Sequence, residues 1–410
     1  MKYLTFTLLI LLSSFPLSAD DWPRFRGPNG SGLASPSPNI PVQFSSSDFN
    51  WKIELPGTGH SSPSVWGDHL FVTCSDPASA RRTLLCINTK DGSKFWEKDF
   101  DSHTFKQHPD NSYAAATPAV DADQDYLCWI APESYMFYAF DHKGNEIWKR
   151  DLGPFKSQHM NGGSPILLGD MVILAVDQDV ADKSYVIAMD RKTGEPRWQT
   201  PKRGGTAASS TPCIYQPREG NPQVILTNTA DSMQSLDART GKLVWEVPQV
   251  MRLRSVASPI VAGDLIVANC GEGAKNRVLI AVRPPASPGQ KPQIVYKITT
   301  TTSPYVPSPL YKDGRLYLWN DTGGVTCLKS ASGEVIWEGQ TKADFYGSPI
   351  CVNDKLYAMS KKGEVIVVGM GEKFELLARN PLSEMTHATP AIANGKLFLR
   401  TTSHLYCLGK

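Results

Sequence analysis

The sequence predicts an all-β fold, an eight-bladed β-propeller of four-stranded antiparallel blades, and three observations point to it. A Ser-Pro or Thr-Pro dipeptide opens eight successive β-rich segments, at intervals of 40 to 55 residues. The 32 glycines and 31 prolines among 410 residues imply many turns and argue against a helical bundle. A tryptophan recurs at the same point near the end of most segments. Radially arranged four-stranded sheets account for all three observations.

Each segment has the same internal order. It opens with one of the dipeptides Ser62-Pro63, Thr117-Pro118, Ser164-Pro165, Thr211-Pro212, Ser258-Pro259, Ser308-Pro309, Ser348-Pro349 and Thr389-Pro390. Proline suits the first residue of a strand, where its missing N–H costs least. Turn residues that accept positive φ, such as Gly67-Asp68, separate the first two strands, and a second turn precedes the outer strand. The outer strands carry Trp96, Trp148, Trp198, Trp245, Tyr296 and Trp337, which we expect to pack between neighbouring blades.

The eighth segment ends after its third strand, and the missing outer strand stands at the other end of the chain. Residues 50–55 repeat the pattern of the outer strands and include Trp51. We therefore expect this N-terminal strand to complete the last blade, which closes the ring and removes two exposed sheet edges. The predicted organisation is a signal peptide (1–19), a leader segment (20–49) and the propeller (50–410).

The first nineteen residues have the features of a secretory signal peptide. Lys2 precedes an apolar run from Leu4 to Leu12, and a small residue, Ala19, ends the segment. This run is too short to span a bilayer, and no later stretch approaches the length of a transmembrane segment. The net charge of +2 gives no electrostatic footprint for nucleic acid. We therefore expect an exported monomer, periplasmic or extracellular, that binds no nucleic acid.

The eight cysteines do not have the spacing of a disulfide framework. Cys86, Cys327 and Cys407 stand where sister segments have alanine or serine, a pattern typical of a cramped core position that needs a small residue. Buried free thiols are the favoured interpretation, although one pair could still form.

The repeat unit resembles the pyrroloquinoline-quinone (PQQ) repeat family. Its clearest copies are residues 186–198 and 234–245, each ending in Thr-Gly, a short spacer and Trp. The start of the mature chain (21–32) and the His-Pro-Asp-Asn segment at 108–111 resemble exported bacterial members of unassigned function. The resemblance implies an eight-bladed propeller, and the family contains both quinoprotein alcohol dehydrogenases and a non-enzymatic subunit of the outer-membrane assembly machinery.

Quinoprotein enzymes of that family hold PQQ between a tryptophan and a disulfide of adjacent cysteines, above a calcium ion. This sequence has no adjacent cysteines and no long insertions between blades. The acidic stretch at 121–125 lacks the glycine and terminal glutamate of an EF-hand loop and is interpreted as a solvated hairpin turn. His103 and His108, near Asp110, could bind a metal but are more simply solvated. We expect no cofactor and no metal, with PQQ plus calcium as the alternative.

Loops that enter the innermost strands surround the mouth of a propeller channel, and here they carry large polar or aromatic side chains. The predicted rim residues are His60, Tyr113, Asn161, Arg254, Tyr305, Tyr346 and His387, with Ser209 in the fourth blade. These residue types dominate binding sites. We therefore predict a non-enzymatic binding or scaffolding module for a protein or envelope component, with a PQQ-dependent alcohol or sugar dehydrogenase as the alternative. Protonation of His60 and His387 near pH 6 should strengthen binding of an acidic partner.

Overall fold

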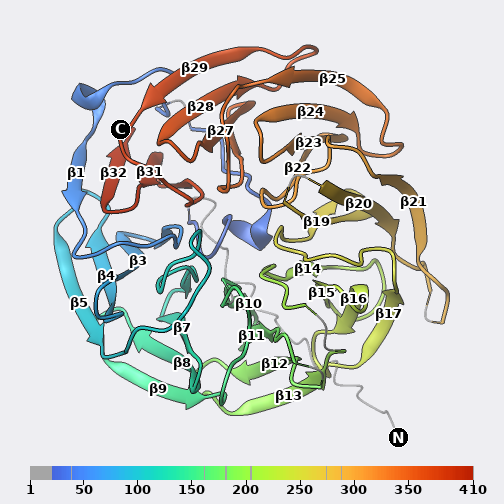
Figure 1. Ribbon diagram of the computed structural model, residues 1–410, viewed down its shortest axis with the longest axis horizontal. Coiled ribbons are helices and arrows are strands. Elements are labelled where there is room, and N and C mark those ends of the chain that lie inside the picture. Colours follow the sequence, from blue (N-terminus) through green and yellow to red (C-terminus); the bar gives the residue numbers. More distant parts are fainter. Residues whose placement is uncertain are drawn as a thin grey trace, which may run out of the picture.

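The predicted propeller is confirmed. The computed structural model describes residues 21–37, 39–160, 162–180, 182–203, 206–273, 275–287 and 289–409. These residues form eight four-stranded sheets arranged as blades around a central axis (Figure 1). Two short 3-10 helices, η1 (Pro28–Gly30) and η2 (Ser46–Asp48), are the helices of this part of the chain. The predicted signal peptide and rim residue Asn161 lie outside the described residues.

Blades one to four follow one another along the chain, each running from its innermost to its outermost strand. Blade one contains β2 (Ser64–Trp66), β3 (His69–Ser75), β4 (Arg82–Asn88) and β5 (Lys94–Phe100). Blade two contains β6 (Ala119–Val120), β7 (Gln124–Ala131), β8 (Ser134–Asp141) and β9 (Glu146–Asp151). Blade three contains β10 (Ile166–Leu168), β11 (Met171–Val176), β12 (Tyr185–Asp190) and β13 (Pro196–Pro201). Blade four contains β14 (Cys213–Tyr215), β15 (Gln223–Asn228), β16 (Ser232–Asp237) and β17 (Leu243–Val247).

Blades five to seven repeat this order, and blade eight takes its outer strand from the N-terminal side. Blade five contains β18 (Ile260–Ala262), β19 (Leu265–Glu272), β20 (Lys275–Arg283) and β21 (Gln293–Ile298). Blade six contains β22 (Leu310–Lys312), β23 (Arg315–Trp319), β24 (Gly324–Lys329) and β25 (Val335–Gln340). Blade seven contains β26 (Ile350–Val352), β27 (Lys355–Met359), β28 (Glu364–Gly369) and β29 (Leu376–Pro381). Blade eight contains β30 (Ala391–Ala393), β31 (Lys396–Arg400), β32 (His404–Leu408) and β1 (Trp51–Glu54).

Strand β1 closes the ring as the sequence predicts. It pairs antiparallel with β32, and Trp51 stands opposite Cys407. The two strands come from opposite ends of the chain and lie side by side in Figure 1. This pairing gives the last blade its fourth strand and covers the free edge of β32.

A closed ring of hydrogen bonds explains why serine or threonine precedes each repeated proline. The backbone N–H of Ser62 donates to the hydroxyl of Thr117 in the next blade at 2.9 Å. The same bond recurs from blade to blade at 2.9 to 3.3 Å. Thr389 completes the circle by donating to the hydroxyl of Ser62 at 3.0 Å. These residues are buried, so each bond satisfies an N–H that would otherwise be orphaned.

The repeated tryptophans fasten neighbouring blades together near the outside of the ring. The indole N–H of Trp51 donates to the carbonyl of Thr89 in the next blade, and Trp96, Trp148, Trp198 and Trp337 make equivalent bonds. Gly92 has φ of +75° and lies against the Trp51 ring, which a Cβ at this position would approach to 2.8 Å. The small residue expected in the repeated slot stands directly opposite the tryptophan, as in Cys86 opposite Trp96. All eight cysteines are buried and free.

The leader segment crosses the central channel and contacts blades on several sides. Trp22 pairs with Val65 of blade one. Arg24 donates to the carbonyl of Pro212 in blade four at 2.8 Å, and Arg26 donates to that of Pro309 in blade six at 2.8 Å. Helix η1 accordingly lies near the centre of the ring in Figure 1. The leader therefore obstructs the channel just below the ring of hydroxyls, because both carbonyls belong to the prolines that follow Thr211 and Ser308.

The acidic stretch at 121–125 forms the expected hairpin turn between β6 and β7, but only its tip, Ala122 and Asp123, is exposed. Asp125 is fully buried, with 0% of its surface exposed, and Asp121 is also buried. Asp121 accepts hydrogen bonds from Tyr126 and Arg191, whereas neither carboxyl oxygen of Asp125 has a partner among the described residues. Burial, reinforced by Asp141, raises the pKa of Asp125 well above its ordinary value. Burial without a partner therefore favours the neutral carboxylic acid form of Asp125.

In the described part of the chain, no helix is long and apolar enough to cross a membrane.

Candidate functional site

A funnel of about 650 Å³ opens on the face of the ring where the innermost strands begin. Five of the predicted rim residues line it, and Ser209 does so as well: these are His60, Arg254, Tyr305, Tyr346 and His387. Tyr113 does not. Its hydroxyl donates to the carbonyl of Phe105 at 2.9 Å, and its ring lies against the Phe105 ring beside the funnel, outside its lining.

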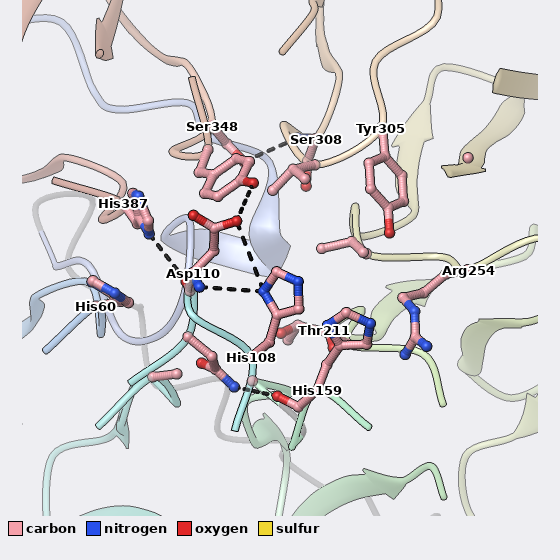
Figure 2. A pocket seen from close by; sticks show the side chains of 18 of the residues that line it. His60, His108, Asp110, His159, Thr211, Arg254, Tyr305, Ser308, Ser348 and His387 are labelled. Carbon is pink, nitrogen blue, oxygen red and sulfur yellow. Dashed lines mark hydrogen bonds and ion pairs between the residues drawn. The ribbon is translucent and has the colours of Figure 1, made fainter. Parts of the chain in front are cut away.

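Two predicted rim histidines lie close together, with their rings tilted at 39°, at the seam between the first and last blades (Figure 2). The rings of His60 and His387 are 4.4 Å apart, and Tyr346 meets His387 edge-on at 4.6 Å. Burial, the neighbouring His387 and the fully buried Arg400 together lower the pKa of His60 to about 3. Burial and Lys361 also lower the pKa of His387. The expectation that His60 becomes charged near pH 6 is therefore wrong, and burial also opposes charging of His387.

The connection between blades one and two lies over part of the funnel. Asp110 in this connection contacts residues of blades seven and eight. Its carboxylate accepts a hydrogen bond from the Tyr346 hydroxyl at 2.9 Å and lies 3.7 Å from Lys361. Its backbone carbonyl lies 3.2 Å from Nδ1 of His387. Although burial opposes it, bonding to Tyr346 and the charge of Lys361 hold the pKa of Asp110 below its ordinary value. Asp110 thus ties a connection from blade one to blades seven and eight.

A second set of side chains forms the opposite wall (Figure 2). The rings of His108 and His159 lie 4.5 Å apart. Burial, Arg254 and His108 together lower the pKa of His159 to about 4. Arg254 donates through Nη1 to the carbonyl of Ala207 at 2.9 Å and has no ion-pair partner among the described residues. Arg254 therefore places a fixed positive charge beside the two imidazoles of this wall.

The base of the funnel is formed by the hydroxyl ring and the leader. Seven of the eight ring residues line the funnel, as does Phe25. Arg24 and Arg26 flank Phe25 in the sequence and are buried, with 6% and 0% of their surfaces exposed. Burial lowers their pKa values to about 10 and 9, so both stay charged at neutral pH. Neither forms an ion pair with a carboxylate in the part of the chain that the structure describes.

Sequence reasoning missed His108, Asp110 and His159 as funnel residues, as well as Phe25 at the base. Two signals were present. The segments 21–32 and 108–111, singled out by their resemblance to exported family members, both meet at the funnel. The metal hypothesis joined His103 to His108, but His103 lies 3.5 Å from Glu133 and does not line the funnel. Among the described residues, no group of three or more His, Cys, Asp or Glu side chains could hold a metal ion.

The funnel residues do not fit PQQ in the manner that the resemblance implies. No tryptophan and no cysteine is among the described funnel residues, so neither half of the sandwich is present there. Of the two carboxylates in the lining, Asp110 is engaged by Tyr346 and Lys361, which leaves Glu272. One carboxylate is a poor calcium site, since calcium takes about six to eight oxygen ligands.

Fold and site together define an eight-bladed propeller of Ser/Thr-Pro repeats with a polar funnel above an obstructed channel. The chain belongs to the PQQ_2 family, described as "Outer membrane protein assembly factor BamB", whose model matches residues 47–209, 134–284 and 299–404. Its sequence is 23% identical over 299 residues to the outer membrane protein assembly factor BamB of Yersinia pestis, covering 67% of this chain and 72% of that protein.

Enzymes are also similar to this chain. It is 24% identical over 288 residues to a polyvinylalcohol dehydrogenase of a Pseudomonas species, covering 61% of this chain but only 41% of that enzyme. The crystal structure of quinohemoprotein alcohol dehydrogenase from Comamonas testosteroni superimposes with a TM-score of 0.68 at 12% identity, covering 95% of this chain and 80% of that chain. At such identity the likeness shows the fold alone.

Proposed function

We propose that this protein is an exported binding or scaffolding module of the cell envelope that engages a protein partner through its funnel. The observation that carries the proposal is the funnel itself, in which Arg254, Tyr305, Tyr346, His60 and His387 gather from five blades around one cavity. Arginine and aromatic side chains dominate the energetics of protein interfaces. The assembly factor among its relatives supports a protein partner and an envelope location.

The predicted signal peptide, leader and propeller are part of this proposal. Residues 1–19 would direct export, and residues 20–49 would run from the exported N-terminus to β1. The hydrogen bonds of Arg24 and Arg26 to the inner strands support a leader that packs against the propeller.

The proposal is tested by capturing partners from envelope extract with immobilised protein. Tyr305→Ala and Arg254→Ala together remove an aromatic ring and the wall charge, whereas Arg239→Ala removes an exposed arginine from a turn between outer strands. We expect the double variant to lose the captured partner and the control to retain it, with both melting as the unaltered protein does. Equal capture by all three proteins would contradict a role for the funnel.

A quinoprotein dehydrogenase is the second candidate, favoured by the polyvinylalcohol dehydrogenase among the relatives. Purified protein supplied with PQQ and calcium should show no alcohol- or aldose-dependent reduction of an artificial electron acceptor, since the funnel lacks the groups that would position the quinone. Robust turnover with a primary alcohol or an aldose would replace the proposed function with this one.

A further inference from the structure

The hydroxyls of the central ring are donors without acceptors. Each hydroxyl oxygen already accepts a backbone N–H from the neighbouring blade, as Thr117 does from Ser62. None of the eight donates its own O–H to an acceptor within the described residues. A hydroxyl can donate one bond and accept two, so each ring member retains one O–H for a group on the axis. Seven of the eight line the funnel.

Positive charges outnumber negative charges around this ring. Arg252 and Arg254 line the funnel without ion-pair partners among the described residues, and Lys361 balances Asp110. Glu272 is the remaining carboxylate of the described lining. Below the ring, Arg24 and Arg26 add two buried charges whose hydrogen-bond acceptors among the described residues are the carbonyl oxygens of Pro212, Pro309 and Pro349. Charges in a water-poor interior act over longer distances than surface charges do, so the axis of the funnel is positive.

The imidazole of His108 adds another donor. Its Nδ1 accepts the backbone N–H of Asp110 at 3.2 Å, which places the proton of the neutral ring on Nε2. Arg254 uses only Nη1 in its bond to Ala207, which leaves its other N–H groups free to meet a ligand. Hydroxyl, imidazole and guanidinium donors thus surround one cavity, and its volume lies within the range of about 300–1,000 Å³ that is common for small-molecule sites.

We propose that the funnel binds an oxyanion, a carboxylate or a phosphate, on the propeller axis above the hydroxyl ring, with Arg254 closing on it from the wall. The ring supplies O–H donors from several blades, and the two buried arginines of the leader stabilise the negative charge from below. The anion can belong to the C-terminus or an acidic side chain of a peptide, or to a phosphorylated molecule. This inference rests on the proposed function, because it names what the funnel recognises in its partner.

The test is calorimetric titration of the full chain, in buffer without phosphate, with three probes. The first probe is inorganic phosphate. The other two are a tripeptide that is acetylated at its N-terminus and has a free C-terminal carboxylate, and the same tripeptide with a C-terminal amide. We expect phosphate, the acid peptide or both to bind, and the amide to bind at least tenfold more weakly than the acid. Binding of phosphate alone identifies a phosphorylated ligand, and binding of the acid alone identifies a peptide.

Matched variants locate the bound anion. Arg254→Gln should weaken binding roughly tenfold or more, since it removes a charged donor, while Arg239→Gln in a turn between outer strands should bind as the unaltered protein does. Thr117→Val removes one ring hydroxyl and should weaken binding, whereas Thr117→Ser keeps the hydroxyl and should not. If Thr117→Val fails to fold, the two arginine variants still decide the question.

Three results would overturn the oxyanion site: no binding of either phosphate or the acid peptide, measurable binding of the acid and amide peptides with equal affinity, or equal affinity in the Arg254→Gln and Arg239→Gln proteins. If partner capture still depends on Arg254 and Tyr305 in that event, the funnel remains the binding surface and only its ligand chemistry is wrong. If capture is also independent of them, the proposed function fails with it.

Discussion

The backbone N–H of Thr389 donates to the hydroxyl of Ser62 at 3.0 Å, although the two residues stand 327 positions apart in the chain. This bond joins the last blade to the first on the inner side of the ring. On the outer side, Trp51 of the N-terminal strand donates to Thr89 of blade one. The seam therefore carries the inner bond that joins every pair of neighbouring blades and the outer tryptophan bond that also joins blades one to two, two to three, three to four and six to seven.

The hydrogen bond from Thr389 to Ser62 predicts that Ser62→Ala destabilises the protein. The substitution leaves the buried N–H of Thr389 without its acceptor, and we expect a loss of about 1–3 kcal/mol in the free energy of unfolding. Chemical denaturation measures it. Ser287→Ala, at an exposed loop serine, is the matched control and should change stability by less than about 0.5 kcal/mol. Equal stability of both variants would show that the ring bond contributes nothing at the seam.

The outer fastening predicts that Trp51→Ala costs about 3–5 kcal/mol, because a large buried ring and its bond to Thr89 are both lost. Deleting residues up to Leu55 should cost at least as much, since it removes β1 altogether. Ile147→Thr, beside Trp148 but exposed, should be within about 0.5 kcal/mol of the unaltered protein. A truncated protein with an unchanged melting temperature would refute closure by the N-terminal strand.

Buried histidines predict that stability falls in acid. The unfolded chain takes up a proton on His60 as the pH drops below about 6.5, whereas the folded protein does so only near pH 3. The contribution of His60 to the stability of the folded protein is therefore complete above pH 6.5, and it is lost progressively as the pH falls toward 3. His60→Gln should lose less stability between pH 7 and pH 4.5 than the unaltered protein, by up to about 2 kcal/mol. His103→Gln, at an exposed histidine, should follow the unaltered protein, and identical pH profiles for all three would contradict this account.

The buried carboxyl of Asp125 should give the opposite pH dependence of stability. Its pKa is raised in the folded protein, so its contribution is complete below the unfolded pKa and is lost as the pH rises through the folded pKa. An asparagine in its place needs no proton to stay neutral, and we expect Asp125→Asn to be more stable than the unaltered protein at high pH, by about 1 kcal/mol or more. Asp123→Asn, at a largely exposed neighbour, should change little. A less stable Asp125→Asn protein would reveal an ionised Asp125 with a partner.

The architecture was predictable because each blade is encoded by a local sequence pattern that repeats along the chain. Proline occupies a fixed place in every unit, and the turn glycines and tryptophans do so in most units, so the truncated eighth unit and the orphan Trp51 could be matched to each other. The reason for the serine or threonine was not predictable, because its hydrogen bond reaches the next blade. The burial of Asp125 was missed for a different reason, since a short acidic stretch between two strands is ordinarily exposed.

The funnel was predictable only in part. Residues a few positions before each proline lie at the rim when the preceding loop is short, which holds for Arg254, Tyr346 and His387. The rule fails for Tyr113, because the long first connection places Asp110 over the mouth and turns Tyr113 toward Phe105. The path of such a connection depends on contacts with blades seven and eight, more than two hundred residues away, which the sequence pattern does not encode.

The central claim, that the funnel is the working surface, is tested most directly by photo-crosslinking. A photoreactive amino acid replaces Arg252, an exposed funnel residue, in one protein and Arg239, in a turn between outer strands, in another. Each protein is irradiated in envelope extract. The account predicts a defined protein adduct from position 252 that Tyr305→Ala with Arg254→Ala abolishes, and no such adduct from position 239. An adduct from position 239 alone, or one from position 252 that survives the double substitution, would contradict it.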